Sequence, residues 1–275
     1  MYDQSLNLEH HNTYSKLIYL LMIASSFIWI TDSLAADQQD YIKESRLRQI
    51  FYVGTGMYQG TVAFQSDRLQ LQSDLSFLPM LQVGAQWWGD ESKGLYTHAE
   101  LGLGADLTLP AAYQSQVLNF NQNSFLLGGH YRWHLSARPL APDITLRLGL
   151  YAMTQDVGQQ NPTLFVNRST YGPQLSTAFT YPWKAHIWTR LQFGLSNPVL
   201  MREEPADSGE MDQGYQWFVQ LEQHVKISRV LGIYVIVNYS QEDIDFVGFG
   251  TRANGVQQGT HQQDMVSASI ALSYR

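Results

Sequence analysis

The sequence of 275 residues contains no cysteine, and only 15% of its residues are charged. The absence of cysteine excludes a disulfide framework, catalysis by a thiolate and a lipidated N-terminal cysteine. The charged fraction lies well below the roughly 25% that is typical of soluble domains. The net charge is -7 and no basic stripe is present, so we predict no binding to nucleic acid. Helical periodicity is also lacking after residue 48.

The N-terminal part of the chain has the pattern of a signal peptide. Lys16 precedes the apolar run of residues 17–30, and Ala35 is suited to cleavage after it. This run is shorter than the roughly 20 apolar residues of a membrane-spanning helix, although a retained anchor helix is the alternative. We therefore expect a signal peptide over residues 1–35, a short periplasmic segment over 36–46 and one domain over 47–275.

The dominant feature of the remaining sequence is alternation with a period of two. In residues 94–110, GLYTHAELGLGADLTLP, the leucines share one parity, and the other parity carries His98, Glu100 and Asp106. Such alternation predicts a β-strand with one apolar and one polar face. The stretch is about three times as long as the five or six residues of an ordinary strand. The pattern recurs, and we predict ten strands, over residues 47–59, 76–89, 94–109, 122–137, 143–155, 169–182, 184–197, 213–228, 230–241 and 262–274.

The connections between these predicted strands alternate between short and long. The segments GDES, SARPLAP, YPW and SRV are short, whereas the other connections are much longer. Short periplasmic turns and long extracellular loops are typical of membrane barrels. We therefore predict an all-β fold, a closed antiparallel up-and-down transmembrane β-barrel of about 10 strands, with 8 or 12 as alternatives. Its apolar parity would face lipid and its polar parity the lumen, the reverse of a soluble barrel.

The last predicted strand adds a resemblance to a known class. In VSASIALSY, the residues Ile270, Leu272 and Tyr274 occupy every second position. With the signal peptide and the alternating strands, this resembles the Gram-negative outer-membrane β-barrel proteins; Arg275, after the final aromatic residue, departs from their pattern. The resemblance implies a location in the cell outer membrane and contact with its lipid and lipopolysaccharide. It also implies recognition of the last strand by the barrel-assembly machinery.

The polar parity of the predicted strands carries ionisable residues that we expect to form a network in the lumen. Side chains fill the lumen of a barrel of about eight strands, and ten strands are close to that number. We therefore expect a plugged polar lumen and a non-catalytic protein, either a narrow or gated porin-like channel or a structural surface protein. The expected network comprises His98, Glu100, Asp106, His130, Arg132, His134, Arg147, Lys184, His186, Arg190, Glu222, His224 and Lys226.

Four of the histidines, His98, His134, His186 and His224, are expected to lie toward the periplasmic ends of their strands. Histidine is the commonest metal ligand and titrates near neutral pH. However, no compact ligand motif such as H-E-x-x-H is present. We therefore predict no metal and no cofactor, and interpret these residues as part of a plug in which His, Arg and Glu satisfy one another.

An outer-membrane enzyme is the first alternative function. The HLS triplet at residues 134–136 resembles the His-x-Ser spacing of outer-membrane lipid hydrolases. Omptin-like proteases combine acidic and histidine residues at the extracellular mouth, and His261 with Asp243, Asp245 and Asp264 is the comparable group here. Neither group includes a recognisable convergent site, so we do not predict catalytic residues.

Binding or adhesion through an acidic extracellular loop is the second alternative. Carboxylate oxygens suit Ca²⁺ and Mg²⁺, which would bridge the loop to lipopolysaccharide or to an external partner. A solvated charged loop is the simpler interpretation. The acidic residues of this loop are Glu203, Glu204, Asp207, Glu210 and Asp212.

Overall fold

The structure is a computed structural model that describes residues 49–67, 70–108, 117–136, 138, 140–158, 165–248, 250–251 and 258–275. The predicted signal peptide and the segment 36–46 lie outside these ranges. None of the described residues belongs to a helix long and apolar enough to cross a membrane. The strands of these ranges are β1 (Ile50–Ser66), β2 (Gln70–Trp88), β3 (Lys93–Gly102), β4 (Ala105–Thr108), β5 (Val117–His134), β6 (Asp143–Gly158), β7 (Asn167–Lys184), β8 (Ile187–Ser196), β9 (Leu200–Glu204), β10 (Glu210–Lys226), β11 (Leu231–Val247) and β12 (Gln258–Tyr274).

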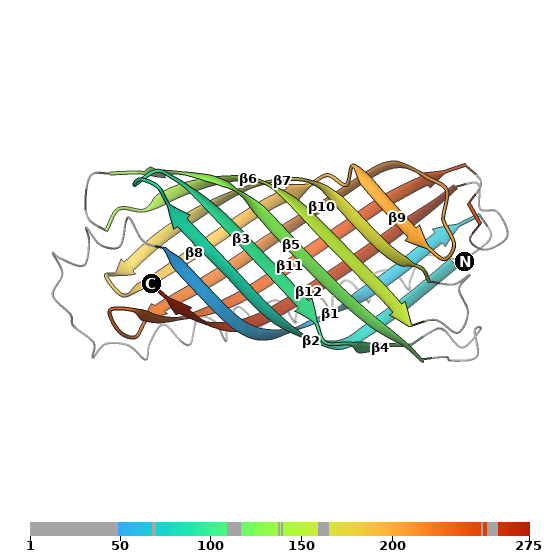
Figure 1. Ribbon diagram of the computed structural model, residues 1–275, viewed down its shortest axis with the longest axis horizontal. Coiled ribbons are helices and arrows are strands. Elements are labelled where there is room, and N and C mark those ends of the chain that lie inside the picture. The colour runs from blue at the N-terminus through green and yellow to red at the C-terminus, as the bar shows by residue number, and fades with distance from the viewer. Residues whose placement is uncertain are drawn as a thin grey trace, which may run out of the picture.

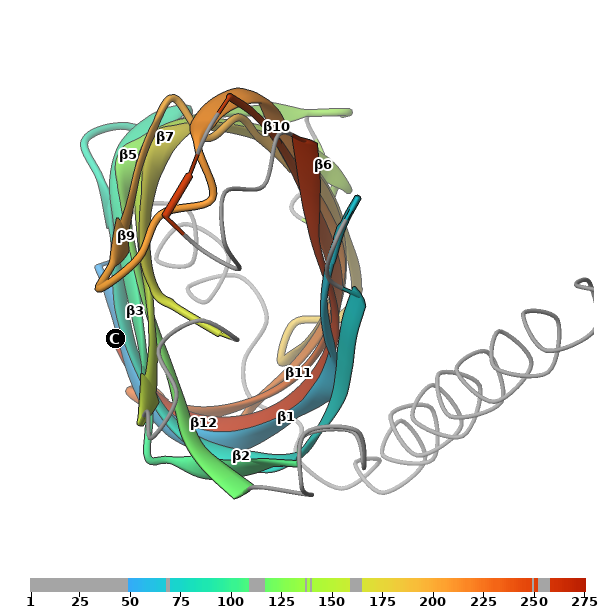
Figure 2. The ribbon, with the colours of Figure 1, turned by 90° about the vertical axis from the view of Figure 1, so that its right-hand side faces the viewer.

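The strands form a single antiparallel sheet that closes on itself (Figures 1 and 2). Closure comes from β1, which pairs with β2 on one side and with β12 on the other, from Phe51 opposite Tyr274 to Ser66 opposite Gly259. Two short strands extend the wall: β4 follows β3, and β9 follows β8 but pairs only with β7. A closed sheet pairs its backbone groups internally, as lipid requires. The predicted ten-stranded antiparallel barrel is thus confirmed, with β4 and β9 as additions.

The two ends of the barrel differ in their connections. β1 begins and β12 ends at the same end, where residues 89–92, 135–142, 185–186 and 227–230 connect the strands; we call this the turn end. The opposite end, the loop end, carries the other five connections. The predicted long connection between the first two strands is wrong, because β1 continues to Ser66 and β2 already begins at Gln70.

The turn at residues 89–92 is closed by its own side chain. The Asp90 carboxylate accepts hydrogen bonds of 2.7 Å from the backbone N–H groups of both Ser92 and Lys93. These bonds favour the charged form and lower the pKa of Asp90. Side-chain caps of this kind are typical of tight turns in solvent.

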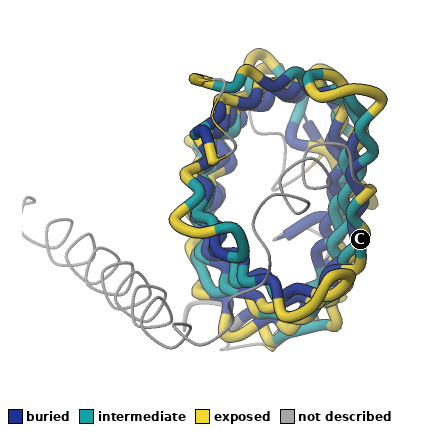
Figure 3. Tube along the Cα trace, turned by 90° about the vertical axis from the view of Figure 1, so that its left-hand side faces the viewer, coloured by how far each residue is buried: buried dark blue, intermediate teal, exposed yellow. Residues whose placement is uncertain are grey.

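The wall presents apolar side chains outward and polar ones inward. Exposed and buried positions alternate along the strands (Figure 3). On β6, for example, Leu148 and Leu150 are 63% and 68% exposed, whereas Arg147, on the opposite parity, is 7% exposed. Exposed aromatic residues flank this apolar surface, with Trp133 and Trp183 near the turn end and Tyr171 and Tyr215 toward the loop end. Such an exterior fits a bilayer with two interfaces.

The alternation breaks between β3 and β4. Gly104 has a φ of 91°, a left-handed conformation that favours glycine, and it separates the two strands. Beyond this break the parity is reversed, so Leu107 is fully buried inside the barrel and Asp106 is exposed. The prediction that Asp106 faces the lumen is therefore wrong.

Candidate functional site in the barrel lumen

Most of the expected network lies on the inward parity of its strands. These residues are His98, Glu100, His130, Arg132, Arg147, Arg190, Glu222, His224 and Lys226. Lys184 is exposed because β7 ends there, so its predicted place in the lumen is wrong. His186 lies in the two-residue turn that follows, and His134 is the last residue of β5. Both are half-buried at the turn end.

Two stacks of aromatic, histidine and arginine side chains occupy the lumen near the turn end. In one, the Trp88 and His130 ring centroids are 3.8 Å apart, and the Arg132 guanidinium lies 3.8 Å from the Trp88 ring centroid. In the other, His224 stacks on Trp188 at 4.7 Å. The guanidinium of Arg132 also donates to the backbone carbonyl of Glu91 in the 89–92 turn. The lumen is therefore filled here, as expected for a barrel of this size.

Glu100 is the centre of a hydrogen-bonded chain that reaches across three strands. Its carboxylate contacts His98 Nε2 at 3.1 Å and accepts a 3.0 Å bond from the Ser124 hydroxyl and another from the Tyr58 hydroxyl. The opposite ring nitrogen of His98 lies 2.8 Å from the Tyr52 hydroxyl. All the oxygens of this carboxylate are therefore held by neighbouring side chains.

The second lumenal carboxylate, Glu222, is also fully engaged. One oxygen lies 3.4 Å from Arg190 Nη1, and the other accepts a 2.6 Å bond from Gln220. Arg190 in turn donates to Thr180 at 3.2 Å. Of the expected network, His98 with Glu100 and Arg190 with Glu222 are thus in contact.

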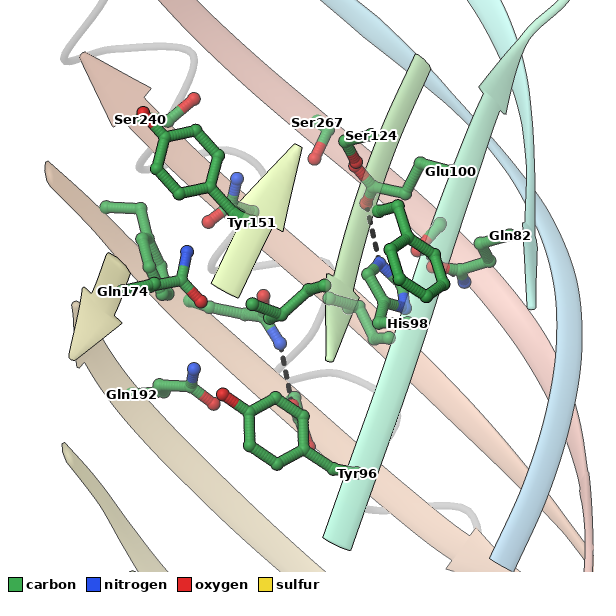
Figure 4. A pocket seen from close by; sticks show the side chains of 18 of the residues that line it. Gln82, Tyr96, His98, Glu100, Ser124, Tyr151, Gln174, Gln192, Ser240 and Ser267 are labelled. Carbon is green, nitrogen blue, oxygen red and sulfur yellow. Dashed lines mark hydrogen bonds and ion pairs between the residues drawn. The ribbon is translucent and has the colours of Figure 1, made fainter. Parts of the chain in front are cut away.

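A cavity of about 150 Å³ lies in the lumen between these groups. Side chains converge on it from opposite walls, with Gln174 and Gln192 on one side and His98 and Glu100 on the other (Figure 4). Amide and hydroxyl groups make up much of its lining, together with the Arg147 guanidinium. The space is comparable to a cavity that accepts a benzene-sized molecule.

Arg168 and Glu242 form a buried ion pair that the sequence analysis missed. Both side chains are 2% exposed, and they connect β7 with β11 across the lumen. Arg168 also donates a 2.8 Å hydrogen bond to the amide oxygen of Gln155. The amide nitrogens of Gln155 and Gln263 both donate to the amide oxygen of Gln122, at 2.9 Å and 2.7 Å. We call these five residues the Arg168–Glu242 layer.

Apolar side chains fill the lumen next to this layer, toward the loop end. Each strand that contributes Gln122, Gln155 or Glu242 places an apolar residue two positions nearer the loops on the same face. Phe64 and Phe246 meet here from β1 and β11, with ring centroids 6.5 Å apart. We call this cluster the apolar cap; it comprises Tyr58, Val62, Phe64, Leu71, Leu75, Leu78, Met80, Leu107, Leu118, Phe120, Val157, Phe165, Ile244, Phe246 and Met265, all at most 5% exposed.

The structure separates the residues of the proposed protease-like group. His261 faces inward on β12, whereas Asp243, Asp245 and Asp264 lie on outward parity. Asp264 accepts a bond from Tyr239, and Asp245 accepts bonds from Gln213 and Thr260, all on the outer face. The wall therefore lies between the histidine and the carboxylates. Among the described residues, no group of three or more His, Asp or Glu side chains is arranged to hold a metal ion.

The acidic loop is held partly by the sheet. Its first residues belong to β9, where Glu203 pairs with Arg168 along the backbone and its carboxylate accepts a 2.5 Å bond from the Ser208 N–H. Asp207 exchanges hydrogen bonds with Thr251 in the β11–β12 connection. Glu204, Asp207, Glu210 and Asp212 are exposed, and Arg202 pairs with Glu204. The carboxylates thus lie around the loop end without converging on one point.

Comparison with known proteins identifies the fold. No protein-family description matches the chain, and no curated protein matches its sequence. Among solved structures, the outer-membrane protease OmpT from Escherichia coli is similar with a TM-score of 0.54 and 10% identity, over 89% of this chain and 99% of that chain. OprG from Pseudomonas aeruginosa has a TM-score of 0.41 and 10% identity, over 83% and 96%. The translocator domain of NalP from Neisseria meningitidis has a TM-score of 0.40 and 9% identity, over 95% of this chain and 97% of that chain.

The chain therefore has the fold of the Gram-negative outer-membrane β-barrels, as the sequence resemblance implied. The apolar exterior with its flanking aromatic residues fits the outer-membrane location of that class.

Proposed function

We propose that this barrel is a non-catalytic, narrow conduit of the outer membrane, closed by the apolar cap. The observation that carries the proposal is the contiguous apolar cluster inside the lumen, beyond a polar cavity. A membrane barrel has no need of apolar side chains on its inner face unless they exclude water from it. Hydrophobic constrictions gate channels by dewetting, because an ion or polar solute must shed water to pass them.

The position of the cap supports gating rather than permanent closure. Phe64 and Leu71 flank the β1–β2 connection, and Phe165 immediately precedes β7. Met201, just before the acidic loop, and Met211, within it, pack against the cluster. Much of the cap thus lies close to the loops, and loops open at a lower free energy than core strands do. Displacement of a loop would open a path to the cavity.

Replacement of the two central phenyl rings tests this function. We expect Phe64→Ser/Phe246→Ser to raise the open time at least tenfold in planar-bilayer recordings, a change equivalent to about 1.4 kcal/mol. Wild-type barrels should show only rare, brief steps, because the cap stays dry. Folding of each variant is checked by its gel mobility with and without heating.

Phe77→Ser is the matched control, since Phe77 belongs to β2 but is 62% exposed on the outer face. Its conductance should equal that of the wild type. A folded Phe64→Ser/Phe246→Ser barrel that remains silent would contradict the conduit and favour a structural surface protein.

The orientation of the barrel is proposed from its connections, with the turn end in the periplasm and the loop end outside. An epitope tag within residues 203–212 should be labelled on intact cells, and a tag within 90–93 should be labelled only after permeabilisation. The reverse pattern would invert the assignment.

The proposed partners follow from this placement. Lipid and lipopolysaccharide would surround the wall. Ile270, Leu272 and Tyr274, at least 50% exposed on β12, would present the terminal pattern to the barrel-assembly machinery.

A further inference from the structure

We propose that the lumenal cavity binds a small organic carboxylate with a compact apolar body, and that Arg147 is the residue that binds its charge. The idea that this ligand is transported depends on the proposed conduit function. Binding of the ligand does not depend on it and can be measured without recording a current. Within the described residues Arg147 is buried and forms no ion pair, and the cavity that it lines has a suitable size and lining for such a ligand.

Arg147 differs from the other buried arginines in its partners. Arg168 and Arg190 each pair with a carboxylate, and Arg132 is held by a backbone carbonyl and the Trp88 ring. Arg147 is 7% exposed, yet its hydrogen bond goes to the neutral amide oxygen of Gln192, at 2.8 Å. Throughout the described part of the chain, no carboxylate forms an ion pair with it. A buried charge without a counter-ion is costly, so this position favours an anion.

The nearby carboxylates do not fill this role. Glu222 is engaged by Arg190 and Gln220, and Glu100 is engaged by His98, Tyr58 and Ser124. Both line the same cavity as Arg147. Their partners fix them on the wall, and neither of them forms an ion pair with Arg147.

The geometry of the guanidinium suits a carboxylate. Nη1 is held by Gln192, whose amide donates to Ser176 at 3.1 Å, and the Tyr96 ring centroid lies 5.2 Å from the guanidinium carbon. These contacts fix the side chain. Nε is buried without a partner, and Nη2 donates to no residue in the described ranges, so Nη2 is the group that can donate to a carboxylate oxygen in the cavity.

The rest of the cavity indicates an apolar body for the ligand. Leu126, Met153, Phe218 and Ile236 line it together with the amides. Its volume of about 150 Å³ equals that of a cavity known to accept benzene. A benzoate-sized carboxylate therefore satisfies both the charge at Arg147 and the apolar part of the lining, whereas an inorganic anion satisfies the charge alone.

Thermal unfolding of the full-length barrel in detergent tests the site with a pair of probes that differ in charge. Sodium benzoate and benzamide share shape and apolar area, and ionic strength is held constant with sodium chloride. We expect benzoate to raise the melting temperature saturably, by about 3–6 °C at tenfold above its Kd. Saturation-transfer NMR on the benzoate ring protons measures binding directly. Equal shifts with benzamide or with chloride alone would overturn the proposal.

Two variants separate binding from folding. Arg147→Gln removes a buried cation without a counter-ion, so it should fold and lose the benzoate response. Arg132→Gln removes the same charge from a stack in the same lumen that lies outside the cavity, and it should retain the response. A response that persists in Arg147→Gln would also overturn the proposal. Benzoate binding by a barrel that never conducts would refute the conduit alone, and conduction without benzoate binding would refute the site alone.

Discussion

Arg168→Gln is expected to lower the free energy of unfolding by about 3–5 kcal/mol, because it leaves Glu242 as an uncompensated buried charge. Both partners are 2% exposed, and the guanidinium also holds Gln155 within the Arg168–Glu242 layer. The measurement is urea-induced unfolding from lipid vesicles. The double variant Arg168→Gln/Glu242→Gln should recover part of the loss, since it removes both charges.

The exposed pair Arg202–Glu204 provides the control for this result. Its side chains are 78% and 58% exposed, so water already screens the charges. Arg202→Gln should change stability by no more than about 1 kcal/mol. If Arg168→Gln has as small an effect as Arg202→Gln, the buried ion pair does not stabilise the barrel.

Leu148→Arg is expected to cost about 2–4 kcal/mol, because it places a charge on the lipid face near the middle of the bilayer. Leu148 is 63% exposed and lies a third of the way along β6, beyond the turn-end aromatic residues. The same unfolding measurement in vesicles gives the loss.

Thr154→Arg is the depth control on the same strand and the same outer face. It lies six positions nearer the loop end, where an arginine reaches the interface and costs only about 0–1 kcal/mol. Equal losses at the two positions would contradict the assignment of this face to lipid.

The sequence was sufficient for the fold and for most of the inward-facing residues. Strict alternation assigned His98, Glu100, Arg147 and Glu222 to the lumen, because one face had to be apolar in lipid. It failed at Asp106, where the left-handed conformation of Gly104 interrupts the strand and reverses the parity. The alternation of residue types alone does not reveal such a break, because Gly104 looks like any other glycine in a strand.

The Arg168–Glu242 layer and the apolar cap were beyond this reasoning for different reasons. The predicted strand 169–182 begins one residue after Arg168, and the predicted strand 230–241 ends one residue before Glu242. The residue types do not change where these strands end, so the sequence does not mark their true limits. Cap residues such as Phe64 are apolar on an inward face. Their outward neighbours on β1 and β2, such as Gln65, Gln70 and Gln72, are polar and exposed. The alternation is therefore reversed at the cap, and a rule that assigns the apolar parity to lipid misplaces these residues.

The seam between β1 and β12 has a consequence for biogenesis. Its outermost pair joins Phe51 to Tyr274, almost the first and the last described residues. Until β12 is present, the sheet therefore keeps two unpaired edges, which a bilayer does not tolerate. We therefore expect the strands to insert into the membrane together, after β12 has become available to pair with β1. A chain truncated before β12 is therefore expected to fail to insert, rather than to form a smaller barrel.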